Sequence, residues 1–62
     1  MKRNSIKMQI YSLLWNNKER GITTDEFMSL ILTTKWHIYD EIRLLRELGV
    51  EIVNVKNRYY MV

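Results

Sequence analysis

The sequence predicts a single α+β domain over residues 1–62, in which three helices precede a C-terminal β-hairpin. Three observations support this fold class. Apolar residues recur at helical spacing in three separate stretches. A glycine, Gly49, directly follows the third stretch. Two runs rich in β-branched and aromatic residues then flank a short polar link, which is typical of a hairpin. A chain of 62 residues has room for one domain.

The composition excludes several classes of site. The chain has no cysteine, and His37 is its only imidazole, so we expect no metal site and no cofactor. No apolar run is long enough to span a membrane, and the N-terminus lacks the features of a signal peptide. We therefore expect a cytoplasmic protein with no membrane partner. The net charge of +3 and the pI near 9.5 favour nucleic acid as a partner, although solvated surface charge explains the composition equally well.

The first helix is expected over Ser5–Trp15, where Ile6, Ile10, Leu13 and Leu14 fall at helical spacing. Ser5 or Asn4 can cap its start. The polar segment NNKERG at residues 16–21 ends it. Three larger side chains form a second patch on this helix, which we interpret as core edge or as the surface of a homodimer: Met8, Tyr11 and Trp15.

A short edge strand at Ile22 and Thr23 is expected to lead into the second helix, which starts near Thr24. Thr23 and Glu26 have the spacing of a capping box, in which each side chain bonds the backbone of the other residue. This helix is expected to carry Phe27, Leu30 and Ile31 inward. The acidic residues at its start have a structural explanation, because carboxylates are favourable at the positive end of a helix.

The third helix is expected to start at Thr33 or Thr34 and to end at Gly49, which suits a left-handed position. Ile38, Ile42 and Leu45 form its inward stripe. Residues 50–55 and 59–62 are expected to be the two strands of the hairpin, with the Ile22 segment as a third strand. The turn between them is the polar link Lys56-Asn57-Arg58.

The helix–Gly–hairpin segment IYDEIRLLRELGVEIVNV, residues 38–55, resembles the winged helix-turn-helix family. The likeness is to the kind found at the N-terminus of the biotin-protein ligase repressor and in small phage-type helix-turn-helix proteins. It covers roughly residues 6–62. Leu32 and Thr33 depart from it, since the family usually has a glycine and an aliphatic residue there, and so do Asp40 and Glu41, which phosphates would repel.

The resemblance implies a sequence-specific double-stranded DNA-binding protein, either a transcriptional regulator or a phage-type accessory factor. The third helix would enter the major groove, the hairpin would be a wing on the DNA backbone, and the first helix would form a homodimer. The DNA-binding residues implied are Thr34, Lys35, Trp36, His37, Tyr39 and Arg43 on the helix, with Lys56, Asn57 and Arg58 at the wing tip. Other basic residues would add phosphate contacts: Lys2, Arg3, Lys7, Lys18 and Arg20.

Several of these residues have a second interpretation. Arg43 has Asp40 and Glu47 at helical spacing and can pair with either. Trp36 lies off the inward stripe, so it either folds back onto the second helix or is an exposed anchor for a partner protein or a thymine methyl group. The alternative function is therefore a protein-binding module, such as a viral inhibitor or adaptor of a host protein, that uses Trp36 and Tyr39. We expect no enzyme, because no catalytic constellation or phosphate loop is present.

Overall fold

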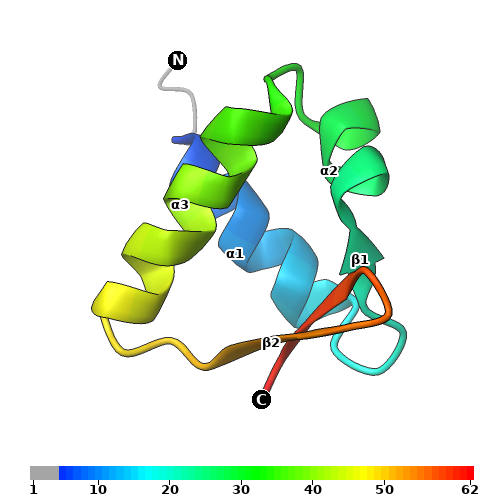
Figure 1. Ribbon diagram of the computed structural model, residues 1–62, viewed down its shortest axis with the longest axis vertical. Helices are drawn as coiled ribbons and strands as arrows, with labels where there is room; N and C mark the ends of the chain where they lie inside the picture. The colour runs from blue at the N-terminus through cyan, green and yellow to red at the C-terminus, as the bar shows by residue number, and fades with distance from the viewer. Residues whose placement is uncertain (1–4) are drawn as a thin grey trace.

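The computed structural model describes residues 5–62 as three helices and a three-stranded antiparallel sheet (Figure 1). This confirms a small α+β fold, and the layout is compatible with a winged-helix arrangement. The elements follow the order α1 (Ile6–Asn16), β1 (Ile22–Thr23), α2 (Thr24–Leu30), α3 (Lys35–Glu47), β2 (Ile52–Val55) and β3 (Arg58–Met61). The proposed phosphate contacts of Lys2 and Arg3, and the candidate cap Asn4, lie outside the described residues.

Each helix begins at a hydroxyl cap, as the sequence predicts. The side chains of Ser5, Thr23 and Thr34 each accept a hydrogen bond from the backbone N–H three residues later, at 3.2, 3.1 and 3.2 Å. At α2 the Glu26 carboxylate also accepts from the backbone N–H of Thr23 at 3.0 Å, which completes the predicted capping box. These bonds satisfy backbone N–H groups that a helix start otherwise leaves free.

The inward stripe of α3 forms the centre of the core. Ile38, Ile42 and Leu45 are buried, as predicted, and α3 packs on α1, which passes behind it in Figure 1. The sheet closes one end of the helices (Figure 1). The other buried side chains are Ile10, Leu14, Ile22, Phe27, Ile31, Ile52, Tyr59 and Met61. None of the helices within residues 5–62 is long and apolar enough to cross a membrane.

Leu30 does not enter the core, and this expectation was wrong. The chain leaves helical geometry at Ile31, whose backbone is extended with φ −121° and ψ 118°. Ile31 is buried, whereas Leu30, the last residue of α2, lies at the surface with 62% of its area exposed. Within α2 itself only Phe27 is buried, so only part of the predicted stripe faces the core.

The sheet has the strand order β1-β3-β2, so the C-terminal strand lies in the middle. Ile22 pairs with Tyr59, which confirms the short third strand, and Val55 pairs with Arg58 across the hairpin. The turn therefore contains only two residues, Lys56 and Asn57, with φ 52° and 67°. Positive φ at both central residues is the signature of the type I′ turn, which matches the twist of paired strands. The predicted three-residue turn was wrong, since Arg58 is the first residue of β3.

The end of α3 fixes where the hairpin lies. Gly49 has φ 99°, and the N–H groups of Gly49 and Val50 bond the carbonyls of Arg46 and Leu45 at 3.0 Å each, which is the Schellman pattern. The Arg46 guanidinium then donates to the Ile52 carbonyl at 3.0 and 2.8 Å. The last turn of α3 is thus bonded directly to the first residue of β2.

Substitution of the two glycines by alanine can show how closely Tyr60 of β3 packs on Gly21, the residue before β1. Both have positive φ, but a Cβ at Gly21 would lie 2.6 Å from the Tyr60 ring, whereas a Cβ at Gly49 meets nothing within 4 Å. We expect Gly49→Ala to lower the free energy of unfolding by about 1–2 kcal/mol through backbone strain. Gly21→Ala should lower the free energy of unfolding by about 1–3 kcal/mol more than Gly49→Ala does, because the added methyl group also overpacks against Tyr60. Urea denaturation measures both.

A third variant separates the packing effect from the strain. Adding Tyr60→Ala should cost less stability in the Gly21→Ala background than in the wild type, because it removes the clash. Equal losses for the two glycine variants would contradict a close approach of Tyr60.

Candidate nucleic-acid interface

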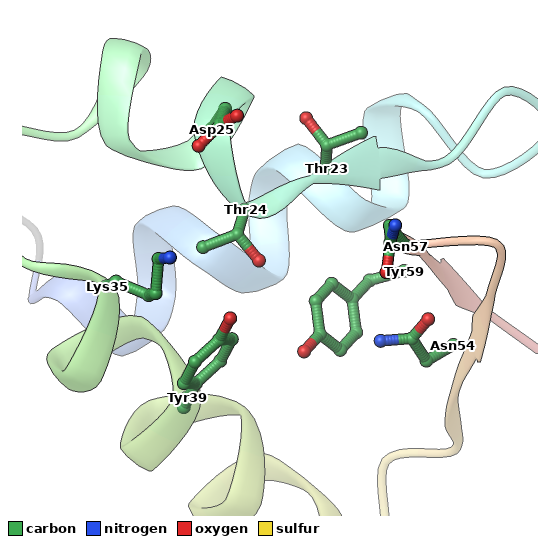
Figure 2. Close-up of a pocket in the computed structure, with 8 residues that line it drawn as sticks. All are labelled: Thr23, Thr24, Asp25, Lys35, Tyr39, Asn54, Asn57 and Tyr59. Atoms are coloured by element: carbon green, nitrogen blue, oxygen red, sulfur yellow. The ribbon is translucent and has the colours of Figure 1, made fainter.

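An open polar groove of about 440 Å³ lies between the first half of α3, the β1–α2 junction and the hairpin (Figure 2). We call it the α3–hairpin groove. Three elements far apart in the sequence build it, and hydroxyl, amide and charged groups dominate its lining. The lining residues are Thr23, Thr24, Asp25, Lys35, Tyr39, Asn54, Asn57 and Tyr59.

The groove offers hydrogen-bonding groups that the fold does not use. Figure 2 shows the Tyr39 hydroxyl directed from α3 into the groove, with the Asn54 amide and the Tyr59 side chain facing it from the hairpin. Within the described part of the chain, none of these three side chains makes a hydrogen bond, and no polar side-chain atom is both buried and unsatisfied. The Tyr59 ring is held by the core through a tilted contact with Phe27, with centroids 6.4 Å apart. The hydrogen-bonding groups of Tyr39 and Asn54 are therefore exposed to a ligand, and Tyr59 lies beside them with its ring held by the core.

Glu26 fixes the wall of the groove opposite α3. Its carboxylate accepts from the Thr23 N–H at 3.0 Å and from Arg20 at 2.9 Å, and it lies 3.4 Å from Arg58. The Thr23 hydrogen bond, then that from Arg20, lowers the pKa of Glu26 to about 2, and the charges of both arginines add to this effect. One ionised carboxylate thus joins the loop before β1, the start of α2 and the start of β3.

The N-terminal turns of α3 expose a pair of aromatic rings. Trp36 is 76% exposed, and its ring meets that of Tyr39 edge-on, with centroids 5.9 Å apart. Of its two predicted placements, Trp36 adopts the exposed one and does not fold back onto α2. Leu32, in the turn before α3, is 97% exposed. Lys35 lies beside these residues and lines the groove.

Arg43 is paired with its own helix, as one interpretation of the sequence expected. Its guanidinium bonds Asp40 and Glu47, at 2.7 Å each. The Asp40 carboxylate, and then that of Glu47, raise the pKa of Arg43. More than half of each of these side chains is exposed, so water screens both ion pairs. The pairs neutralise the cation without holding it in the protein interior.

The basic residues of the hairpin divide into two kinds. Lys56 and Asn57 form the tip and are exposed, as expected. Arg58 is half-buried at the base of β3, where it lies 3.4 Å from both the Gly21 carbonyl and the Glu26 carboxylate. Its expected place at the tip was wrong, because the two-residue turn puts position 58 in the strand.

Two of the predicted helix residues serve the local structure. Thr34 caps α3. His37 is exposed, with Nδ1 3.1 Å from the Thr33 hydroxyl and Nε2 3.5 Å from the Glu41 carboxylate. Among residues 5–62 there is no group of three or more His, Cys, Asp or Glu side chains arranged to hold a metal ion.

The outer face of α1 carries the apolar patch that the sequence indicates. Met8 is 52% and Trp15 58% exposed, whereas Tyr11 is half-buried against the core. Lys18 lies over the Trp15 ring, 5.0 Å from its centroid. A homodimer through α1 stays a prediction.

Sequence reasoning assigned three of the groove's eight lining residues to the site: Lys35, Tyr39 and Asn57. The five that it missed lie in four different elements, so no local pattern marks them as a set: Thr23, Thr24, Asp25, Asn54 and Tyr59. Compared with known protein families, with curated proteins and with solved structures, the chain matches none.

Acid titration should reveal the role of Glu26. A carboxyl whose pKa falls from its usual 4.5 to about 2 on folding stabilises the fold above pH 4.5, and this contribution is lost as the pH falls towards 2. Glu26→Gln keeps an acceptor for the Thr23 N–H but lacks the charge. We expect wild type to be more stable at pH 7, and the two proteins to converge between about pH 4.5 and 2.

Urea denaturation at a series of pH values measures this difference. Glu51→Gln is the matched control, because Glu51 is exposed and its carboxylate forms no ion pair within residues 5–62. A gap between wild type and Glu26→Gln that stays constant down to pH 2 would contradict the assignment.

Proposed function

We propose that the protein is a winged helix-turn-helix protein that binds double-stranded DNA in a sequence-specific manner and acts as a transcriptional regulator or phage-type accessory factor. In this proposal α3 enters the major groove and the β2–β3 hairpin is the wing, which follows the backbone. The observation that carries the proposal is the α3–hairpin groove. Its hydroxyl and amide groups are of the kind that position a protein on phosphate and sugar oxygens.

Two lysines place positive charge at the groove and at the tip of the hairpin beside it. Lys35 lies at its α3 wall, and Lys56 is at the tip of the hairpin. Neither forms an ion pair within the described residues, so both charges are available to phosphates. Asp25 also lines the groove and opposes this attraction. The proposal therefore requires hydrogen bonds as well as charge to hold the backbone.

Arg43 belongs to this interface as a reader of bases. Its planar fork can bond two acceptors of a guanine edge. To do so it must leave Asp40 and Glu47, and exposed ion pairs of this kind contribute little because water screens them. A bidentate contact with guanine in a desolvated interface is stronger. Breaking the two ion pairs of Arg43 thus lowers the affinity for DNA without preventing binding.

One set of observations favours a second candidate, a protein-binding module on the same fold. Trp36 and Leu32 are exposed, while Arg43 is neutralised and Arg58 points to Glu26. An exposed aromatic with few free cations around it is the composition of a protein anchor. The two candidates differ in one measurable property, since phosphate binding depends steeply on salt.

A duplex titration over a salt series tests the first candidate. Removal of one lysine–phosphate contact should reduce the slope of log affinity against log salt by about 0.9. We expect Lys35→Ala and Lys56→Ala each to weaken binding to all duplexes and to lower the slope by roughly this amount. Fluorescence anisotropy with labelled duplexes measures both quantities.

Lys18→Ala is the matched control for these variants. It removes the same charge, but from a side chain that packs over Trp15 next to α1. The sequence made Lys18 a candidate phosphate contact, but in the structure it lies over Trp15 and does not line the α3–hairpin groove. The proposal therefore gives it no contact, and the slope of Lys18→Ala should equal that of wild type. No binding by wild type even at low salt would reject DNA binding and leave the protein-binding candidate.

Neutralising the partners of Arg43 should improve DNA binding. In Asp40→Asn with Glu47→Gln the guanidinium no longer has to leave two carboxylates. We expect tighter binding at every salt concentration, and we expect Arg43→Ala in the same background to abolish most of the gain. An equal gain with and without Arg43 would show that the acids act by general repulsion of phosphate.

A further inference from the structure

We infer that Trp36 is a specificity-determining residue that reads the C5-methyl group of thymine in the major groove. This inference rests on the proposed function and adds to it the base that the surface selects. It starts from a residue that the fold does not explain. Trp36 is 76% exposed, and its one aromatic neighbour within residues 5–62 is Tyr39, which touches it edge-on.

The position of Trp36 suits contact with a base edge. It is the second residue of α3, so its ring stands at the end of the helix whose N-terminal residues meet base edges in the proposed complex. The edge-on contact with Tyr39, at 5.9 Å between centroids, holds the indole to one side of the helix. This contact favours one placement of the ring, on the side of α3 that carries Tyr39.

The neighbouring side chains are committed elsewhere. Thr34 caps the helix, and His37 lies between Thr33 and Glu41. Arg43, the proposed reader of guanine, lies in the middle of α3, seven residues beyond Trp36. Lys35 is assigned to phosphate, so Trp36 is the large side chain in the first turn of α3 that is left to meet a base edge, and it is aromatic and apolar.

The chemistry of the major groove then identifies the base. Base pairs display hydrogen-bond donors and acceptors there, and the thymine methyl is the one apolar substituent among them. The apolar face of the indole ring gains most from burying that methyl, whereas its single donor, Nε1–H, can make no bidentate match to a base edge. A surface with an exposed Trp at this place therefore prefers a thymine.

Replacement of thymine by deoxyuridine tests the inference, since it removes the methyl and leaves every phosphate and base-pairing group unchanged. A preferred duplex is first selected from a random-sequence pool with the wild-type protein, and each thymine is then replaced in turn. At one or two positions we expect wild type to bind about fourfold more weakly, which is the value of one buried methyl group. Trp36→Ala should bind the thymine and deoxyuridine duplexes equally.

Two further variants complete the experiment. Trp15→Ala removes the other exposed tryptophan, 58% exposed on α1, and should keep the full preference for thymine. Trp36→Phe keeps a smaller aromatic surface and should therefore keep part of the preference for thymine. Circular dichroism checks that each variant is folded, as expected when an exposed side chain is removed.

The outcomes separate this inference from the proposed function. Salt-dependent binding with no deoxyuridine effect at any position would overturn the role of Trp36 and leave DNA binding intact. A deoxyuridine effect that persists in Trp36→Ala would overturn it as well. Absence of any duplex binding by wild type would overturn both.

Discussion

The carboxylate of Glu26 is the interaction on which the arrangement of the sheet against α2 depends. It closes the capping box with Thr23, and it also holds Arg20 of the preceding loop and Arg58 of β3. A seven-residue helix has little stability of its own, because nucleating a helix is costly. Its start must therefore be fixed by side chains and by packing. Glu26 fixes the start of α2 through its surface hydrogen bonds and ion pairs, whereas the neighbouring Phe27 fixes it by packing in the core.

The opposite wall of the groove is fixed by different means. α3 is held by its apolar stripe, and its last turn is bonded to β2 through Arg46. The residues that build the fold and the residues that face solvent thus occupy separate sides of the same helix. Substitutions at Lys35, Trp36 or Arg43 leave the core untouched, so the outer surface can change its partner without changing the architecture. The same separation explains why the fold alone does not decide between DNA and protein as a partner.

Much of the fold could be predicted because its signals are local. Caps, the Gly49 stop and the stripe of Ile38, Ile42 and Leu45 each depend on residues a few positions apart. The ion pairs of Arg43 were foreseeable for the same reason. Arg58 was placed wrongly because the positive φ angles of Lys56 and Asn57 close the hairpin in two residues and put Arg58 in β3. Leu30 was placed wrongly because α2 ends at that residue and buries only Phe27. The α3–hairpin groove could not be predicted, since it exists only when three distant segments meet.

Arg46 has a consequence for the edge of the sheet that β2 forms. β3 is paired on both sides, which leaves β2 as an edge strand with exposed Val53 and Val55. Because the Glu51 carbonyl bonds Val62 across the sheet, the Ile52 carbonyl must point to the open side. On that side the Ile52 carbonyl accepts two hydrogen bonds from the Arg46 guanidinium. An acceptor on this edge that could pair with a strand of another chain is thereby occupied, and a charged side chain at an edge is one of the devices that oppose edge-to-edge pairing.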